Sequence, residues 1–231
     1  MSHKNRRFIE AEEDDNLQYE KSNRNSLSFE LNPEQQKAIH VIEGNEVTIL
    51  TGKAGTGKTQ LATYYALSKF REGRFDKIVI TRPTVSEEKL GYLKGDLKQK
   101  MDPWLYPIYH CFYALADKNH IETQVKLGNI EISPIAFMRG RTFVRSIVIL
   151  DEAQNITHSQ MKMILTRLGV GSKIIVCGDK KQSDLNEAKI SGLNFVLEKI
   201  VGIPGIGHIE LETNHRSPLV DKIIDIYESN E

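Results

Sequence analysis

Residues 52–59, GKAGTGKT, have the composition and spacing of a loop that binds phosphate groups. The segment follows the apolar run VTILT and precedes a stretch with helical periodicity, which is the context that this pattern requires. Glycine is needed at Gly52, Gly55 and Gly57, because successive backbone N–H groups can wrap an anion only where side chains do not intrude. The helix that begins near Lys58 directs its N-terminal dipole at the same phosphates. The loop therefore predicts a nucleotide polyphosphate as ligand.

Two side chains at the end of this loop have predicted roles of their own. Lys58 supplies a mobile cation for the β- and γ-phosphates, and the Thr59 hydroxyl supplies a ligand for Mg²⁺. A chance match to the bare pattern is expected in roughly one random chain of this length in a hundred, and the strand and helix context makes chance rarer still. We therefore expect ATP and Mg²⁺ to bind here. The predicted nucleotide-binding residues of the segment are Gly52, Lys53, Ala54, Gly55, Thr56, Gly57, Lys58, Thr59 and Gln60.

Two adjacent carboxylates, Asp151 and Glu152, follow the apolar run SIVIL. In an open α/β sheet, ligands bind beyond the carboxyl ends of the strands, where both this pair and the phosphate-binding loop are expected. Asp151 is predicted to hold Mg²⁺ through its water shell, and Glu152 to polarise the attacking water as general base. A carboxylate pair after a strand is otherwise typical of a helix N-cap or a surface turn, but the neighbouring loop favours the catalytic interpretation.

Two further polar segments follow apolar runs nearer the C-terminus. GDKKQ, residues 178–182, follows KIIVC, and its Gln182 is a candidate for contact with the γ-phosphate or the lytic water. An ordinary polar turn is the alternative. LETNHRS, residues 211–217, follows HIEL, and its Arg216 is a candidate arginine finger that offers delocalised positive charge to the transition state. An ordinary surface contact is the alternative for this arginine.

The elements that position these residues alternate between short apolar runs and helical stretches. VTILT, KIVIT, SIVIL, KIIVCG and HIEL have few polar interruptions, as expected of strands covered on both faces. Helical periodicity marks TQLATYYALSKF, SQMKMILTRL, LNFVLEKI and VDKIIDIY, and an earlier helix is predicted where the N-cap Asn32 precedes Pro33. The alternation predicts a three-layer α/β fold of the P-loop type with a mostly parallel sheet.

One stretch departs from this alternation. Between Thr81 and Ile130 the chain carries helical pieces interrupted by glycine and proline, and it is too long for a simple crossover. We predict a helical insertion, with function, assembly and plain packing left open as its role. Residues 1–28 mix charges of both signs with few apolar residues, which predicts a flexible arm. A single domain, residues 29–231, is expected to follow that arm.

Composition narrows the class of protein. A chain of 231 residues with 39% hydrophobic content can bury one substantial core. No apolar run approaches the ~18 residues of a membrane-spanning helix, and the N-terminus lacks a secretory signal, so a cytoplasmic protein is expected, in the host cytoplasm if a phage encodes it. Basic and acidic residues balance at 31 each, so nucleic-acid binding would require a local patch. Cys111 and Cys177 match no metal or redox spacing and are predicted to be reduced, buried thiols.

The motifs taken in order resemble a known set. LNPEQQKAI, GKAGTGKT, ITRPTVS, ILDEAQN, GDKKQ and NHRS are similar to the first RecA-like domain of superfamily 1 helicases. The chain resembles more closely the PhoH family of ATPases, the phosphate-starvation-inducible proteins of bacteria and their phage relatives. TRPTVSEEKLGYLKGDLKQKMDPWLYPIY, ISPIAFMRGRTF and VILDEAQNITHSQMKMILTRLGVGSKIIVCGD carry this likeness, which covers most of residues 31–231. The resemblance implies a RecA-like fold and ATP hydrolysis, with helicase activity as a further implication.

Several residue roles follow from the resemblance alone. Gln35 would recognise the adenine, and Gln154 would couple the state of ATP to a nucleic-acid strand. Thr81 and Arg82 would lie near that strand. The arginine motif TNHRSPLV mixes the helicase-like NxRS with the RxPLV of the PhoH family, which leaves open whether Arg216 serves its own site or that of a neighbour.

Arg139 and Arg141, in the segment MRGR, form the nearest approach to a basic patch in the sequence. They are candidates for binding a phosphate backbone, with a solvated turn as the alternative.

A superfamily 1 helicase closes ATP between two tandem RecA-like domains, and this chain is long enough for one. The resemblance therefore leads to the hypothesis of a homo-oligomer, a hexameric ring, in which each ATP lies at a subunit boundary and the insertion makes contacts. The predicted function is Mg-dependent ATP hydrolysis coupled to remodelling of RNA or single-stranded DNA. An ATP-dependent switch or assembly protein without a nucleic-acid substrate is the alternative. A small-molecule kinase is disfavoured, because Glu152 after Asp151 suits activation of water.

Overall fold

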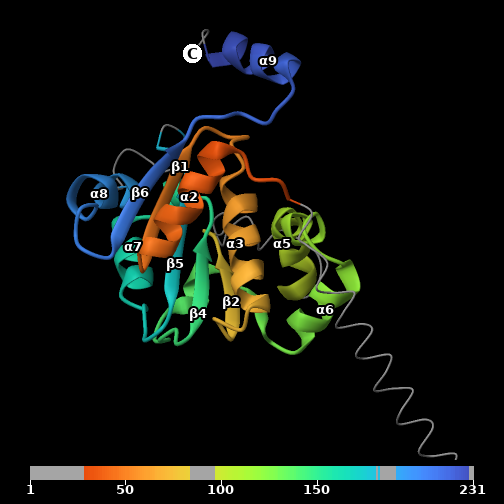
Figure 1. Cartoon of the computed structure of the whole chain (residues 1–231), viewed down its shortest axis with the longest axis vertical. Coiled ribbons are helices and arrows are strands. Elements are labelled where there is room, and N and C mark those ends of the chain that lie inside the picture. The colour runs from red at the N-terminus through yellow and green to blue at the C-terminus, as the bar shows by residue number, and fades with distance from the viewer. Residues whose placement is uncertain (1–28, 84–96, 181, 183–190, 229–231) are drawn as a thin grey trace, which may run out of the picture.

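The computed structural model describes residues 29–83, 97–180, 182 and 191–228, which contain a six-stranded sheet (Figure 1). The strands follow the order β3-β2-β4-β5-β1-β6, and every neighbouring pair is parallel. This sheet confirms the predicted α/β fold. The strands are β1 (Val47–Gly52), β2 (Lys77–Thr81), β3 (Ile130–Ile132), β4 (Ser146–Leu150), β5 (Lys173–Gly178) and β6 (Ile206–Leu211).

Helices cover both faces of the sheet (Figure 1). The described α-helices are α2 (Pro33–Gly44), α3 (Lys58–Arg71), α5 (Leu97–Tyr113), α6 (Lys118–Lys126), α7 (His158–Leu165), α8 (Gly192–Lys199) and α9 (Pro218–Glu228), and two 3₁₀ turns are η1 (Ile135–Met138) and η2 (Ala153–Asn155). The first helix begins as predicted. The Asn32 side chain caps it by accepting from the Gln35 backbone N–H at 2.8 Å, and Pro33 occupies its first turn.

Alternate side chains of the central strands enter two apolar cores, one on each face of the sheet. Leu50 and Ile149 belong to the core that also contains buried residues of α2, α3, α5 and α6. Ile49 and Val148 belong to the core that contains buried residues of α7 and α8. Burial on both faces explains why the strand sequences are almost continuously apolar.

The predicted insertion contains α5 and α6, whose residues Ile108, Phe112 and Ile121 are buried in the first core. Its earlier part, residues 84–96, and the predicted arm, residues 1–28, lie outside the described residues. The chain then enters β3, a strand that the sequence pattern did not predict. Because β3 has only three residues, IEI, it is too short to show a periodicity.

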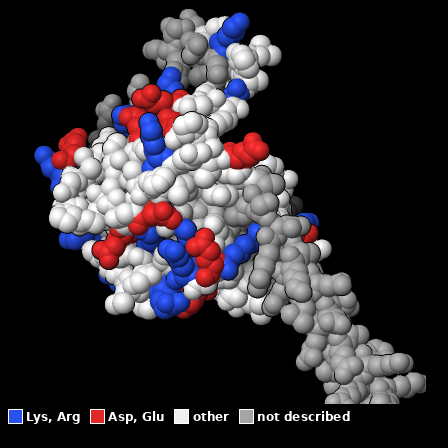
Figure 2. Space-filling model, in the orientation of Figure 1, with Lys and Arg blue, Asp and Glu red and all other residues white. Residues whose placement is uncertain are grey.

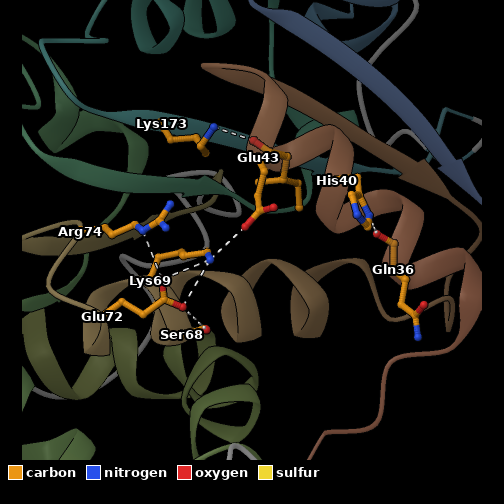
Figure 3. A network of polar contacts seen from close by, with 9 residues as sticks. Gln36, His40, Glu43, Ser68, Lys69, Glu72, Arg74 and Lys173 are labelled. Atoms are coloured by element: carbon orange, nitrogen blue, oxygen red, sulfur yellow. Dashed lines mark hydrogen bonds and ion pairs between the residues drawn. The ribbon is translucent and has the colours of Figure 1, made fainter.

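Polar contacts tie α2 to α3 and to β5 (Figure 3). The Lys69 ammonium of α3 lies 2.9 Å from a Glu43 oxygen of α2 and 3.2 Å from a Glu72 oxygen. The Lys173 ammonium, at the start of β5, donates to the Ile42 carbonyl at 2.5 Å. These contacts anchor the C-terminal end of α2 near the start of β5. The predicted site lies at the other end of the strands, beyond their carboxyl ends.

None of the described helices is long and apolar enough to cross a lipid bilayer. Both cysteines are free thiols. Cys177 is buried in β5 as predicted, whereas Cys111 on α5 is only half-buried, which corrects the expectation that both are enclosed. Burial raises the pKa of Cys111 to about 11, so neither its environment nor its spacing favours a reactive thiolate.

Candidate nucleotide-binding site

The loop between β1 and α3 has the backbone that its glycines predict. Gly52, Gly55 and Gly57 have φ values of 153°, 91° and 77°, which residues with a Cβ rarely adopt. Gly57 is the N-cap of α3, so the helix begins at Lys58 and directs its free N–H groups into the loop. The loop is therefore built to surround an anion.

The Lys58 side chain folds back over this loop. Its ammonium donates to the backbone carbonyls of Gly52 at 2.7 Å and Lys53 at 2.8 Å. Burial lowers the pKa of Lys58, while the nearby acidic groups, including Asp151 and Glu152, oppose that shift. The cation thus lies where β- and γ-phosphates would arrive, held by two carbonyls that a phosphate can replace.

The predicted metal ligands contact each other directly. The Thr59 hydroxyl donates to the Asp151 carboxylate at 2.6 Å, joining the first turn of α3 to the end of β4. Asp151 is 6% exposed, and burial raises the pKa of its carboxyl although the Thr59 hydrogen bond opposes the shift. A buried carboxylate beside a hydroxyl is a hard-oxygen donor set that fits Mg²⁺.

The protein alone supplies few ligands at this point. Among the described residues, no group of three or more His, Cys, Asp or Glu side chains could hold a metal ion. Mg²⁺ at Thr59 and Asp151 would therefore take its remaining ligands from phosphate oxygens and water, as Mg²⁺ commonly does in nucleotide sites.

Glu152 is held by two neighbours. Its carboxylate accepts from the Arg82 guanidinium at 3.3 Å and from the Gln154 side-chain amide at 2.6 Å. The Gln154 carbonyl oxygen in turn accepts from the Asp179 backbone N–H at 3.1 Å, which links the ends of β4 and β5. Glu152 has a φ of 53°, an uncommon left-handed conformation that fixes its direction at the end of β4.

The segment after β6 lies across the phosphate-binding loop. The His215 backbone N–H donates to the Gly55 carbonyl at 3.1 Å, and the His215 ring nitrogen Nε2 lies 3.3 Å from Nε2 of Gln35. A Cβ atom built on Gly55 would lie 2.7 Å from Nε of Arg216. Arg216 thus packs against the loop of its own chain, because β6 pairs with β1 and both strands end at the same edge.

Glu34, in the first turn of α2, anchors this segment. Its carboxylate accepts the backbone N–H groups of Glu212 at 2.6 Å and Thr213 at 3.1 Å. Burial disfavours the Glu34 charge, but these hydrogen bonds outweigh it and lower the pKa of the carboxyl. The clamp joins residues 178 and 179 positions apart in the sequence, so no local sequence pattern pointed to it.

The sequence profile described as "PhoH-like protein" matches residues 30–228. The chain belongs to the PhoH-like family. It is 47% identical over 197 residues to the PhoH-like protein of Bacillus subtilis (strain 168), covering 84% of this chain and 62% of that protein. It is 43% identical over 200 residues to the PhoH-like protein of Synechocystis sp., covering 85% and 61%.

This PhoH-like chain therefore spans about three fifths of the length of the curated relatives that it matches. Among solved structures, the large terminase from a thermophilic bacteriophage is similar with a TM-score of 0.48 and 12% identity, over 85% of this chain and 50% of that chain. At that TM-score, the likeness carries no argument about function.

Two further predicted residues of the PhoH-like chain, Gln35 and Gln182, differ in how close they lie to the loop. Gln35 is buried, and its side-chain carbonyl also accepts from the Asn32 backbone N–H at 3.0 Å, so its amide is fixed beside the loop. Gln182 is exposed and follows β5 by four residues. Among the contacts that the structure gives for the described residues, none joins Gln182 to Lys58 or Glu152.

The candidate nucleic-acid residues have different environments. The Thr81 side chain is fully buried at the end of β2, so only its backbone could face a ligand. Arg141 forms a bidentate ion pair with Glu131 at 2.5 and 2.8 Å, whereas Arg139 is exposed. The Glu131 pairing lowers the pKa of that carboxyl to about 2. Arg139 is thus better placed than Arg141 to meet a phosphate.

Proposed function

We propose that this chain binds ATP with Mg²⁺ and hydrolyses it. The hydrogen bond of 2.6 Å between Thr59 and Asp151 carries the proposal, because it brings a helix-terminal hydroxyl and a buried carboxylate together beside a phosphate-binding loop. Neither a structural turn nor a plain N-cap accounts for a buried acid whose pKa is raised by its burial.

Each group of the loop has a distinct task in this proposal. The backbone N–H groups of residues 53–59 bind the phosphates, and Lys58 exchanges the carbonyls of Gly52 and Lys53 for phosphate oxygens. Thr59 and Asp151 hold Mg²⁺, which neutralises charge on the phosphates when it is bound. These interactions stabilise negative charge that develops during transfer to water.

Glu152 is the proposed general base. Its two hydrogen-bond partners, Arg82 and Gln154, orient the carboxylate so that a water molecule can be polarised toward the γ-phosphate. Because Gln154 also binds the Asp179 backbone, a change in the position of Glu152 would move the loop that leads to Gln182. This connection is a physical route by which hydrolysis could alter the carboxyl edge of the sheet.

Arg216 is proposed to act on the site of its own chain. It packs on Gly55, and Glu34 and Gln35 hold the backbone and the His215 ring of the same segment. A guanidinium beside this loop would offer delocalised positive charge to the outer phosphates. This packing supports the proposal that Arg216 serves the site of its own chain.

We further propose coupling to RNA or single-stranded DNA. Net charge is zero, and Figure 2 shows Lys and Arg intermixed with Asp and Glu on one face, so binding would rest on few phosphate contacts. Exposed Arg139 supports a local contact. The proposed assembly is a homo-oligomer, a hexameric ring, in which the carboxyl edge of the sheet faces a neighbouring copy.

Release of inorganic phosphate from MgATP, with and without a panel of RNA and DNA strands, tests this function. We expect hydrolysis that Lys58→Ala abolishes and that single strands stimulate. If hydrolysis persists but no strand stimulates it over a wide range of salt, the coupling is wrong and an ATP-dependent switch is favoured. If calorimetry detects no binding of MgATP, the proposal as a whole fails.

A further inference from the structure

The 3₁₀ turn η1 presents an aromatic ring to solvent. Phe137 is 56% exposed, whereas the other phenylalanines among the described residues are buried or half-buried. On either side of it, Ile135 and Met138 are buried in the core that also contains residues of α7. The Phe137 backbone N–H donates to the Pro134 carbonyl at 3.0 Å, which closes the turn. The core thus holds the backbone while the ring stays exposed, but single exposed rings are common, so the surroundings decide what this ring can bind.

Basic side chains lie beside this turn. Arg139 ends the turn and is exposed, and Arg141 follows two residues later. The Arg167 guanidinium, from the segment after α7, donates to the Arg141 carbonyl at 3.3 Å. The Lys77 ammonium, at the start of β2, lies 2.7 Å from an oxygen of Glu131, the carboxylate that also pairs with Arg141. We call Lys77, Arg139, Arg141 and Arg167 the basic surface.

The basic surface has an excess of positive charge. Glu131 is one carboxylate against the two cations Lys77 and Arg141. Arg139 and Arg167 add two more cations, and neither has an acidic partner among the described residues. The whole chain has a net charge of zero, so this excess is local. It supplies the kind of patch that attracts a polyanion.

The ring and the charges together favour one kind of polyanion. Phe137 and Arg139 are two residues apart, so their Cα atoms are separated by at most about 7 Å. Each nucleotide of a single strand carries an exposed base and a phosphate, which suit a ring and a guanidinium at this spacing. In a duplex the base faces are covered by stacking, and the carboxylates of an acidic peptide offer no flat surface to the ring. A single strand is thus the polyanion that uses both groups.

The turn also lies near the candidate nucleotide-binding site. It begins three residues after β3 ends, and three residues span at most about 10 Å. The chain leaving β3 is tied to the end of β2, because the Ser133 backbone N–H donates to the Ile80 carbonyl at 3.0 Å. Two residues beyond Ile80, the Arg82 guanidinium contacts Glu152, the proposed general base. A strand on η1 would therefore lie near the residues that hold Glu152.

We propose that Phe137 stacks on a base of single-stranded RNA or DNA while the basic surface binds the adjoining phosphates. The inference rests on the proposed coupling to nucleic acid and deepens it, because it names the contact residues and a preference for single strands over a duplex. Phe137 and Arg167 are the residues that it adds to those the sequence indicated. Arg139 carries the largest share of the phosphate binding, since Arg141 is already paired with Glu131.

Fluorescence anisotropy with a labelled RNA strand and a labelled DNA strand tests the stacking. Without nucleotide, the native chain should bind each single strand more tightly than the duplex of the same sequence. Phe137→Leu keeps an apolar side chain but removes the ring, and it should weaken binding of the single strand by about 5- to 150-fold. Phe137→Tyr keeps a ring and should bind like the native chain. Tyr106→Leu is the matched control, because Tyr106 is 69% exposed on α5, and it should leave the affinity unchanged.

The salt dependence of the same binding tests the charges. Arg139→Gln and Arg167→Gln each remove one phosphate contact, so the slope of log affinity against log salt should fall in magnitude by about 0.7 in each variant. Arg74→Gln is the matched control, since the Arg74 side chain is 66% exposed and lies outside the basic surface, and its slope should be native. Circular dichroism establishes that each variant is folded. Equal slopes in the native and Arg139→Gln chains overturn the assignment of the phosphates to this surface.

Photocross-linking identifies the stacked residue. A single strand that carries 5-iodouracil, irradiated in the complex, should cross-link to the tryptic peptide of residues 127–139, which contains Phe137. The Phe137→Leu chain should lose this cross-link at saturating strand, and the Tyr106→Leu chain should keep it. Cross-links confined to other peptides overturn the inference.

The outcomes separate this inference from the proposed function. If the native chain binds single strands and Phe137→Leu and Arg139→Gln bind them equally well, the surface is wrong while coupling to nucleic acid stands. Equal or tighter binding of the duplex also overturns the inference. A polyglutamate peptide that competes as well as the single strand would assign the surface to acidic proteins instead. If the native chain binds no strand, the inference and the coupling both fail, whereas ATP hydrolysis is judged separately by phosphate release.

Discussion

Asp151 is the residue at which stability and chemistry make opposite demands. Its carboxyl is buried, and burial raises its pKa, so keeping it ionised in the folded protein costs free energy. The Thr59 hydroxyl offsets part of that cost at 2.6 Å, and Mg²⁺ would offset more. Under the proposed function, the cost of this buried acid is offset when Mg²⁺ and a phosphate bind.

Asp151→Asn should therefore stabilise the metal-free protein while impairing hydrolysis. A raised folded pKa means that the folded state binds the proton more readily, so the free energy of unfolding falls as pH rises from about 4 through the raised value. Because the asparagine side chain does not ionise, the variant should not lose stability in this way as pH rises. We expect the variant to have a higher Tm than the native chain at pH 7 without metal. Adding Mg²⁺ together with ADP should raise its Tm no further than ADP alone, and its hydrolysis should be slower by at least about 100-fold.

Asp117→Asn is the control for this change. Asp117 caps α6 by accepting from the His120 backbone N–H at 3.0 Å, is exposed, and can be replaced by asparagine with little loss of capping. It should leave Tm and hydrolysis nearly unchanged. A lower metal-free Tm in Asp151→Asn than in the native chain would contradict the argument from burial.

Glu34 offers a second test at the scale of a single residue. Glu34→Gln removes the charge that accepts from Glu212 and Thr213, so the segment carrying Arg216 should leave the loop more often. We expect faster tryptic cleavage after Arg216 and slower hydrolysis, with binding of MgADP retained. The lowered pKa of Glu34 predicts that the native clamp is complete above about pH 4.5 and is lost as pH falls through the lowered value.

Glu30→Gln provides the comparison, since Glu30 is exposed four residues earlier. Equal cleavage rates after Arg216 in the native chain and Glu34→Gln would show that the clamp does not hold the segment.

The residues of the site differ in how far the sequence could predict them. Gly52, Lys58 and Thr59 were predictable because their spacing is local and their role is fixed by backbone geometry. The Glu34 clamp and the contact of His215 with Gln35 were not, because residues about 180 positions apart meet only once β6 pairs with β1. Long-range pairing of this kind leaves no periodic signal in either segment.

At the scale of the elements, α2 and α3 depend on a polar network as well as on the apolar core. Lys69 is its centre, with oxygens of Glu43 and Glu72 at 2.9 and 3.2 Å (Figure 3). The hydrogen bond from Lys69 outweighs burial and lowers the pKa of Glu43. The network orients α2, which in turn carries Glu34 and Gln35 at its other end.

Glu43→Gln should lower the free energy of unfolding by about 1 kcal/mol or less at pH 7, because partly exposed ion pairs contribute little. The contribution is complete above about pH 4.5 and disappears as pH falls through the lowered pKa of Glu43. Urea unfolding at pH 7 and at pH 3.5 should therefore show a smaller difference between native chain and variant at the lower pH. Glu122→Gln, which breaks a longer pair of 3.8 Å with Lys118, should have a smaller effect.

The elements themselves were largely predictable. The five apolar runs of the sequence are β1, β2, β4, β5 and β6. The first four are almost entirely buried, as strands covered on both faces are, whereas β6 lies at the edge of the sheet and is mostly half-buried. The strand β3 was missed because it has only three residues and the middle one, Glu131, is charged. Its place at the edge of the sheet depends on its pairing with β2. The order of the strands in the sheet depends on the crossover connections between them, which the amino-acid composition of each strand does not determine.

At the scale of the whole molecule, the carboxyl edge of the sheet gathers the ends of β1, β4, β5 and β6 and the start of α9. The proposed nucleotide site, the Arg216 segment and the start of α9 therefore share one edge. Two arrangements of the site in an oligomer are physically distinct. Either each chain completes its own site, or Arg216 of one chain completes the site of the next.

Mixing inactive variants distinguishes these arrangements. Lys58→Ala removes the phosphate-binding cation, and Arg216→Ala removes the guanidinium on Gly55. If Arg216 served a neighbour, a mixed ring would contain sites with both groups, about a quarter of the total in an equal mixture.

Because Arg216 packs on the loop of its own chain and Glu34 anchors its segment there, every chain in the mixture lacks one group at its own site. We expect no recovery of phosphate release on mixing, at protein concentrations where light scattering shows mixed oligomers. Recovery toward a quarter of native activity would instead assign the arginine to the neighbouring site.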